Sequence, residues 1–113
     1  MVRIPRAAAQ EPVAFNESTV SSAPTTSGVY FLYREARLIY IGIAVHGTGI
    51  RQQLEKHLSG AYGERTRTAT AFRFEETRDP VVASREYLLE HMAEHRGRPP
   101  LCNRVGPLEA GSP

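Results

Sequence analysis

Two tyrosines stand ten residues apart in a segment typical of a β-hairpin, and their phenol groups are candidates for chemistry. Tyr30 lies in residues 28–33 and Tyr40 in residues 38–43, and both segments are rich in the β-branched and aromatic residues that strands favour. In an antiparallel pair, the residue numbers of two facing residues always add up to the same value. Two residues an even number of positions apart can therefore face each other directly, with their side chains on one face of the sheet. A three-residue loop at 34–36 would produce it. Without further context, such tyrosines are more typical of amphipathic strand residues with surface hydroxyls.

The remainder of the sequence predicts the helices that would pack on this hairpin. After a turn at 46–49, apolar residues and His57 recur at helical spacing until Gly60 and Gly63. Residues 68–75 alternate as a third strand does. Asp79 and Pro80 then predict the start of a second helix that runs to about Arg96. We expect its apolar contribution to come from Val82, Leu88, Leu89 and Met92.

The order strand–strand–helix–strand–helix predicts a small α/β fold of the α+β type, a three-stranded antiparallel sheet flanked by helices. A chain of 113 residues has the length of one domain. We expect residues 1–26 to be a flexible arm, with at most a short helical turn, because no periodicity is sustained there. Residues 27–105 would form the domain, and the Gly-, Pro- and Ser-rich residues 106–113 a disordered tail.

Positive charge comes almost entirely from arginine, since Lys56 is the only lysine among 14 basic residues. A guanidinium grips phosphate oxygens through paired donors, so an arginine cluster suits a nucleic-acid backbone. A solvated basic surface explains the same cluster equally well, because the net charge is only +2. The arginines crowd one segment, at Arg65, Arg67, Arg73 and Arg78.

The composition also limits where the protein acts. Cys102 is the only cysteine, which excludes an internal disulfide and favours a reducing compartment. No apolar run approaches the ~20 residues that a membrane span needs. The first residues lack the apolar centre of a signal peptide. We therefore expect a soluble, cytoplasmic protein without a membrane partner.

The two tyrosine segments closely resemble a known family. Gly28-Val-Tyr30 followed by Tyr40-Ile-Gly42 is similar to the paired signature that names the GIY-YIG endonucleases. The resemblance covers about residues 27–105 and is nearest to stand-alone members and to the nuclease domain of the bacterial excision-repair C subunit. Three further elements follow in the family's order and at roughly its spacing: a helix bearing His57, a helix reading Tyr-Leu-Leu-Glu90, and a final Pro-Pro-Leu-Cys-Asn103.

The resemblance implies a divalent-metal-dependent endonuclease that hydrolyses phosphodiester bonds in DNA. Glu90 would be the ligand of a single Mg²⁺ or Mn²⁺ ion, a role that suits a carboxylate. Tyr30 would lie beside the attacking water as base or orienter, and Tyr40 and His57 would contact the scissile phosphate. Asn103 would organise the site by hydrogen bonding, with Gly28 and Gly42 as supporting residues of the signature.

The sequence departs from the family at Gln53, four residues before His57, where members usually carry arginine. Arg51 is two residues away and lies roughly 200° around the helix from Gln53. Three explanations stay open: a shifted helix register that turns Arg51 inward, substitution by Arg67 or Arg73, or a weakened site. We expect Arg51, Gln53, Arg65, Arg67 and Arg73 to form the nucleic-acid-binding set.

Other functions are compatible with parts of the sequence. Gln53 favours a nucleic-acid-binding module that does not cut, and a protein-interaction domain without a nucleic-acid role is a third class. RNA is not excluded as the substrate, and specificity would need DNA structure, a homodimer or an accessory protein. The segment His91-Met-Ala-Glu-His95 matches a zinc-protease pattern, but five residues match by chance easily and no third ligand is evident. A zinc site that combines these histidines with Cys102 is no better supported.

Overall fold

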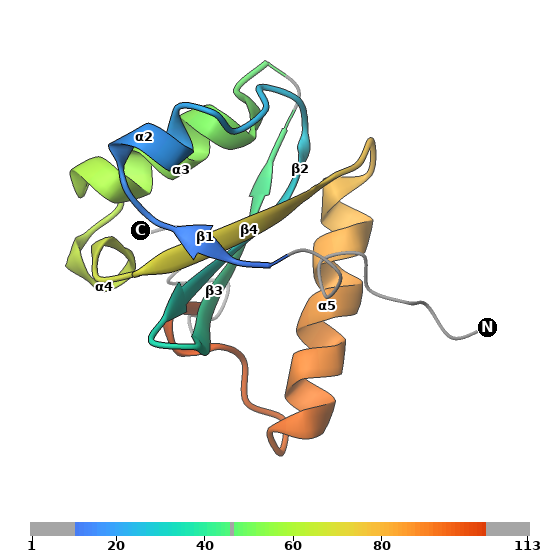
Figure 1. The fold of residues 1–113 in the computed structure, drawn as a ribbon. Coiled ribbons are helices and arrows are strands. Elements are labelled where there is room, and N and C mark those ends of the chain that lie inside the picture. The colour runs from blue at the N-terminus through green and yellow to red at the C-terminus, as the bar shows by residue number, and fades with distance from the viewer. Residues whose placement is uncertain (1–10, 46, 104–113) are drawn as a thin grey trace.

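The hairpin that carries the two tyrosines is present and lies within an antiparallel sheet (Figure 1). The structure is a computed structural model that describes residues 11–45 and 47–103. In it β2 (Gly28–Arg34) pairs with β3 (Arg37–Ala44) on one side and with β4 (Ala71–Glu76) on the other. The short β1 (Val13–Ala14) pairs with β4, which makes the strand order β1-β4-β2-β3. The α+β class is confirmed, whereas the prediction of three strands is wrong because of β1.

The hairpin turn differs from the predicted three-residue loop. Arg34 pairs with Arg37, so only Glu35 and Ala36 form the turn, and both have positive φ, 52° and 70°. Such values are typical of the tight turns that match the twist of two strands. A bulge follows, because Leu32 pairs with Tyr40 while the next residue of β2 pairs with Leu38.

This bulge changes how the two tyrosines meet. Tyr30 is opposite Gly42 rather than opposite Tyr40. Tyr40 is opposite Leu32, two positions along the sheet. Since side chains two residues apart on a strand share a face, the tyrosines are diagonal neighbours on one face, and the predicted direct pair is wrong.

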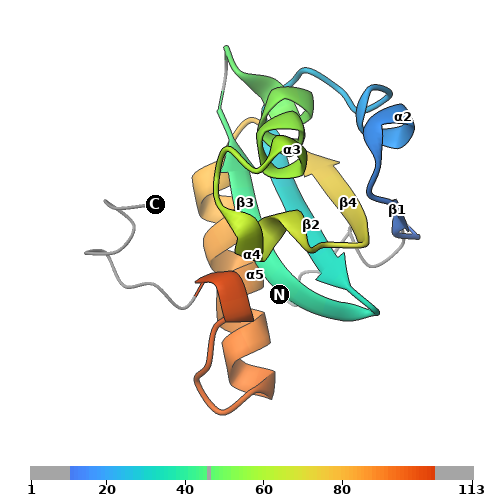
Figure 2. The ribbon, with the colours of Figure 1, turned by 90° about the vertical axis from the view of Figure 1, so that its left-hand side faces the viewer.

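Helices cover both faces of the sheet (Figures 1 and 2). On one face lie α2 (Glu17–Val20) and α3 (Gly49–Ser59), with the short α4 (Glu64–Arg67) following α3. On the other lies α5 (Pro80–Glu94), which leads to the 3₁₀ turn η1 (Leu101–Asn103). The core on the α3 face contains Tyr30, Leu32, Ile39, Ala44, Ile50, Leu54 and Phe72, and the core on the α5 face contains Val29, Phe31, Tyr33, Ile41, Ala83 and Tyr87.

The N-terminal residues 13–26 differ from the flexible arm that the sequence predicts. They form β1 and α2, and the side chains of Phe15, Val20 and Ala23 join the core on the α3 face. The Phe15 ring packs edge-on against Phe72, with 5.9 Å between the centroids. These three apolar residues are spaced too irregularly to show a helical or strand period, which is why the sequence misses them. Residues 1–10 and the predicted tail, 106–113, lie outside the described residues.

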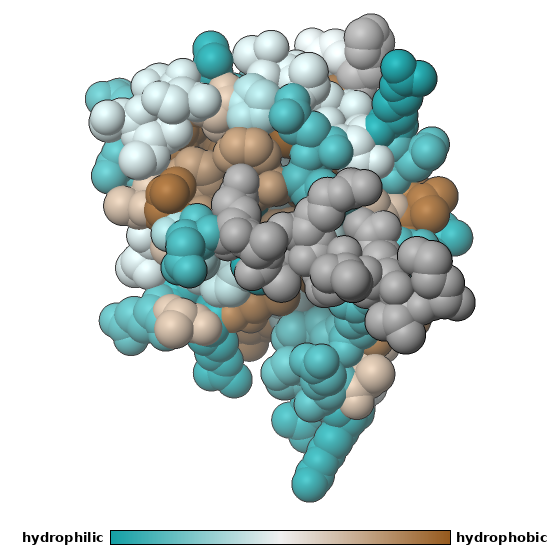
Figure 3. Space-filling view, turned by 45° about the vertical axis from the view of Figure 1, so that its right-hand side comes forward, coloured by the Kyte–Doolittle hydropathy of each residue, from teal (hydrophilic) through white to brown (hydrophobic). Residues whose placement is uncertain are grey.

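The inward face of α5 also differs from the prediction. Pro80 occupies the first helical turn as expected, but Asp79 at the N-cap makes no capping hydrogen bond with its side chain. Ala83 and Tyr87 face the sheet, whereas Val82 and Leu89 are 54% and 60% exposed. The apolar residues of α5 are spread around the helix, so their spacing does not define one buried stripe. In Figure 3, where the α5 side comes forward, hydrophobic surface appears in separate places among hydrophilic residues.

Among the helices of the described residues, none is long and apolar enough to cross a membrane. The longest, α5, has 15 residues.

Truncation of Phe15 tests whether the N-terminal segment belongs to the core. We expect Phe15→Ala to lower the free energy of unfolding by about 3–5 kcal/mol, because it leaves a cavity beside Phe72. Val13→Ala, two residues earlier and 44% exposed, is the matched control and costs less than about 1 kcal/mol. Urea titrations measure both. Equal, small effects would show that this segment does not stabilise the domain.

Candidate active site

A buried chain of three polar side chains connects the sheet to α3 and α4. The Tyr30 hydroxyl and His57 Nε2 share a hydrogen bond of 2.7 Å. The other ring nitrogen, Nδ1, shares one of 2.7 Å with the Thr66 hydroxyl. The three side chains are only 1%, 2% and 5% exposed. Both nitrogens of the imidazole are thus satisfied by protein groups, which fixes the ring in place.

Each member of this chain is positioned by a packing feature of its own element. Ile50 and Leu54 are fully buried and hold α3 against the sheet, so His57, in the last turn, points at β2. Gly42, opposite Tyr30, leaves room for the phenol ring: a Cβ there would lie 2.3 Å from Tyr30 Cζ. Gly28 is similarly crowded, since a Cβ would lie 2.3 Å from the Glu75 carbonyl oxygen. The two signature glycines therefore serve close packing.

Tyr40 completes a cluster of aromatic rings around His57. Its ring centroid lies 6.0 Å from that of Tyr30 and 5.1 Å from that of His57. Tyr40 is half-buried, so it is the member of this trio that solvent or a ligand reaches most readily. The structure thus brings together Tyr30, Tyr40 and His57, three of the four residues that the resemblance assigns to catalysis.

Two residues that the sequence analysis missed border this cluster. The Tyr62 ring lies edge-on to His57 at 4.7 Å, and its hydroxyl donates to Gln53 Oε1 at 2.8 Å. Thr66 bonds His57 from the short helix α4. Both lie in the segment that was interpreted as a helix stop followed by an arginine-rich surface. A four-residue helix carries no periodic signal, so only the tertiary contacts reveal them.

Burial sets the protonation states in the cluster. It lowers the pKa of His57 from 6.5 to about 4, so the imidazole is neutral at pH 7. It raises the pKa of Tyr30 well above 10, with the neighbouring tyrosines adding to the effect. It also raises the pKa of Tyr40. The cluster is therefore uncharged at neutral pH and offers hydroxyl donors. The enclosed Tyr30 is suited to positioning His57 and not to acting as a base beside water.

Asn103 fixes the edge of the sheet beside this cluster. Its Oδ1 accepts a hydrogen bond from the Ile41 amide at 2.6 Å, and its Nδ2 donates to the Ile41 carbonyl at 2.9 Å. This two-bond contact pairs η1 with the outer edge of β3, the strand of Tyr40. Cys102, in the same turn, packs against the core on the α3 face. Asn103 thus organises the backbone of the signature strand.

Glu90 approaches the sheet from the other side. It shares the sheet-facing side of α5 with Ala83 and Tyr87, and it is half-buried. Its carboxylate makes no hydrogen bond or ion pair with other described residues, Tyr30, Tyr40 and His57 included. Because α5 packs mainly on the edge strand β3, Glu90 and Tyr40 belong to opposite faces of the strand that ends the sheet.

The donor set limits which metal this region would hold. Within residues 11–45 and 47–103, no three His, Cys, Asp or Glu side chains lie close enough to hold an ion together. A structural zinc site, with three or four protein ligands, therefore does not fit there. Magnesium keeps several waters and needs only one or two carboxylates plus substrate phosphate, so a single half-exposed Glu90 fits it.

The arginines that the sequence analysis grouped together are dispersed in the structure. Arg51 Nε donates to the Ala23 carbonyl at 2.8 Å, which directs it toward the N-terminal segment. Arg73 pairs with Phe31 on the α5 face and lies over the Phe31 and Tyr33 rings, so it cannot replace an arginine beside His57. Arg65 is exposed on α4, where Arg67 forms an ion pair with Glu64 at 3.3 Å.

Comparison of the sequence with protein-family models and with curated proteins finds no match.

The protonation state of His57 makes stability depend on pH. Its folded pKa, about 4, lies below the unfolded value of 6.5, so the unfolded chain binds the proton more tightly. The contribution of the neutral His57 ring to the free energy of unfolding is fully present above pH 6.5 and is lost as the pH falls toward 4. Over that window we expect the free energy of unfolding to fall by about 3 kcal/mol more in the wild type than in His57→Gln. Urea titrations at pH 7.5 and 4.5 measure this difference, and identical pH dependence would contradict a buried neutral imidazole.

Proposed function

We propose that this chain is a GIY-YIG-type endonuclease that hydrolyses phosphodiester bonds in DNA with the aid of one divalent cation. The observation that carries the proposal is the hydrogen bond between Tyr30 and His57, with the Tyr40 ring packed beside both. The signature glycines and Asn103 serve this arrangement directly, since they make room for Tyr30 and hold the strand of Tyr40. Four of the five sequence elements thus have structural roles around one strand pair.

The role of each residue of the cluster in hydrolysis follows from how accessible its side chain is to a ligand. Tyr30, His57 and Thr66 are enclosed and act as positioning residues. Tyr40 presents a neutral hydroxyl, which donates to a phosphoryl oxygen and stabilises charge that develops in the transition state. Glu90 would hold the cation, which polarises the phosphate and lowers the pKa of an attacking water. The cleavage site would therefore lie at the outer edge of β3, beside η1, between the two faces that carry Tyr40 and Glu90.

Positive charge on the Tyr40 side comes from α3 and α4. Lys56 Nζ lies 5.9 Å from the Tyr62 ring centroid, next to His57. Arg65 and Arg67 follow on α4. These side chains are suited to phosphates that flank the cut, and the same chemistry would accept RNA. A domain of this size leaves little surface for reading base sequence, so a second copy of the chain or an accessory protein would supply specificity.

A second candidate function is nucleic-acid binding without cleavage. The observation in its favour is that the Gln53 and Arg51 side chains both already have hydrogen-bond partners. Gln53 accepts a hydrogen bond from the Tyr62 hydroxyl, and Arg51 donates one to the Ala23 carbonyl. The position where the resembling family carries arginine therefore provides no charge to a phosphoryl group. Loss of such a charge costs a few kcal/mol of transition-state stabilisation, about a hundredfold or more in rate.

A plasmid-nicking assay with and without Mg²⁺ tests cleavage. We expect Glu90→Gln to lower the rate about a hundredfold or more, because the amide binds a hard cation poorly. Tyr40→Phe should lower the rate by tenfold or more while leaving DNA affinity nearly unchanged. Glu55→Gln, an exposed carboxylate on α3, is the control and should cut like the wild type. Metal-independent nicking, or equal rates for Glu90→Gln and Glu55→Gln, would overturn the mechanism.

Gln53→Arg separates the two candidate functions. If the missing guanidinium limits cleavage, this variant should nick plasmid at least tenfold faster than the wild type. Gln52→Arg adds the same charge one residue earlier, at an exposed position, and should leave the rate nearly unchanged. Equal acceleration by both variants would indicate a general effect of charge on DNA affinity. Salt-sensitive binding without nicking in the wild type and in Gln52→Arg, with nicking recovered in Gln53→Arg, would favour the binding module.

A further inference from the structure

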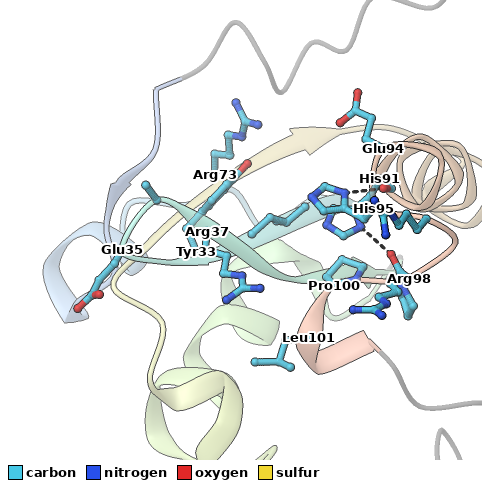
Figure 4. Close-up of a pocket in the computed structure, with 14 residues that line it drawn as sticks. Tyr33, Glu35, Arg37, Arg73, His91, Glu94, His95, Arg98, Pro100 and Leu101 are labelled. Carbon is cyan, nitrogen blue, oxygen red and sulfur yellow. Dashed lines mark hydrogen bonds between the residues drawn. The ribbon is translucent and has the colours of Figure 1, made fainter.

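A large cavity lies between the tip of the β2–β3 hairpin and the C-terminal end of α5 (Figure 4). Its volume is about 930 Å³, and it is open to solvent on one side. The hairpin contributes Tyr33, Arg37 and Leu38, and the helix contributes His91 and His95. Residues 98–101 form the wall that leads into η1. The resemblance to the GIY-YIG family assigns nothing to this region.

The charges that line the cavity favour an anion. Four arginines stand against two glutamates along its walls. In Figure 4 the carboxylates of Glu35 and Glu94 are directed away from the histidine pair. Positive potential from several guanidinium groups in one concave surface is focused by the low-dielectric walls, which raises the local concentration of anions. The arginines are Arg37, Arg73, Arg96 and Arg98.

The two histidines form a rigid part of the wall. Their rings stack with centroids 3.8 Å apart and planes 9° apart. His95 Nδ1 donates to the His91 carbonyl at 2.7 Å, and His91 Nδ1 donates to the Arg98 carbonyl at 3.1 Å. Because a carbonyl only accepts, both Nδ1 atoms carry their proton. In a neutral ring Nε2 then has no proton to donate to a phosphate, so the histidines shape the wall and the arginines supply the donors.

A pair of imidazoles one turn apart is also a familiar arrangement for a transition metal, so the two ligand classes must be weighed. Within the described part of the chain, no third His, Cys, Asp or Glu joins His91 and His95 in a metal-sized group. The surrounding guanidinium groups repel a cation, whereas they attract phosphate and bind it through paired donors. The positive charge of the lining therefore favours an anion over a metal ion as the ligand of this cavity.

The cavity adjoins the proposed cleavage site through two shared elements. Arg37 and Leu38 begin β3, the strand that also carries Tyr40. Leu101 lines the cavity, and Asn103 in the same turn binds Ile41 of that strand. Tyr40 is three positions after Arg37 on this strand, which corresponds to roughly 10 Å. One strand of duplex DNA carries a phosphate about every 3.4 Å along the helix axis and an extended single strand carries them farther apart, so the distance corresponds to a few nucleotides at most.

We propose that this cavity binds the phosphate groups of a nucleic-acid strand, within a few nucleotides of the bond that is cut. Arg37 and Arg98 hold the phosphates from opposite walls, and the stacked histidines form the floor between them. The inference rests on the proposed function for the identity of the strand, whereas the affinity for phosphate rests on the cavity alone.

Fluorescence anisotropy with a fluorescein-labelled 12-nucleotide DNA strand tests the proposal, in EDTA so that no cleavage occurs. We expect Arg37→Gln/Arg98→Gln to bind at least tenfold more weakly than the wild type. The slope of log affinity against log salt should become shallower by about 1.4, or 0.7 for each lost phosphate contact. The matched control, Arg34→Gln/Arg85→Gln, removes two arginines that do not line the cavity and should retain most of the affinity. Circular dichroism confirms that both variants are folded.

Three results would overturn the proposal. The first is equal loss of affinity in both double variants, which indicates bulk charge. The second is unchanged strand binding in Arg37→Gln/Arg98→Gln. The third is calorimetric binding of orthophosphate to the cavity of the wild type while strand binding stays independent of Arg37 and Arg98, which identifies a free anion as the ligand.

The outcome is independent of the nuclease assay. Strand binding that depends on the cavity, in a protein that never nicks plasmid with Mg²⁺, supports the cavity and removes the proposed nuclease function. If the wild type nicks plasmid and Arg37→Gln/Arg98→Gln binds the DNA strand as tightly as the wild type, only the cavity proposal is removed.

Discussion

The arrangement of the candidate site depends on one buried hydrogen bond, between the Tyr30 hydroxyl and His57 Nε2. Both groups lie in an apolar core, where an unsatisfied polar atom costs roughly 1–3 kcal/mol. Thr66 satisfies the second imidazole nitrogen, so the chain of three groups is stable only when β2, α3 and α4 keep their relative positions. Burial keeps the imidazole neutral, and the bond holds it against Tyr40. A polar network of this kind selects one packing of the helix on the sheet, because any alternative leaves buried donors unpaired.

Strand geometry determines which side chains share that environment. The bulge beside Leu32 brings Tyr40 to the face of Tyr30 and His57 as a diagonal neighbour. The alternation along β4 sends Arg73 to the opposite face, over Phe31 and Tyr33. The two faces meet at the outer edge of β3, where Asn103 binds the backbone: Tyr40 lies on one face, and α5 with Glu90 covers the other. The proposed hydrolysis would take place beside this edge, and the basic cavity lies next to it, toward the hairpin tip.

The sequence predicts the elements with a strong local signal and misses those defined by tertiary contacts. The two tyrosine strands, the helix of His57 and the helix that starts at Pro80 all agree with their patterns, because aromatic and β-branched runs, helical spacing and N1 proline are local features. The pairing of β1 with β4, the two-residue turn and the bulge depend on long-range hydrogen bonds that no local pattern contains. Tyr62 and Thr66 reach His57 only after the chain turns back through α4. Arg37 and Arg98 are separated by the whole of β4 and α5, so their common cavity is visible only in three dimensions.

The proposed function requires a divalent cation at the edge of β3, between Glu90 and Tyr40. Paramagnetic line broadening in NMR spectra of the full chain, titrated with Mn²⁺, tests it most directly, because the effect depends on proximity to the ion and not on activity. We predict selective broadening centred on Glu90 that extends across the strand edge to Tyr40 and the Ile41 amide, and its loss in Glu90→Gln. Broadening centred on another part of the protein, or none above the level of non-specific binding, would contradict the account.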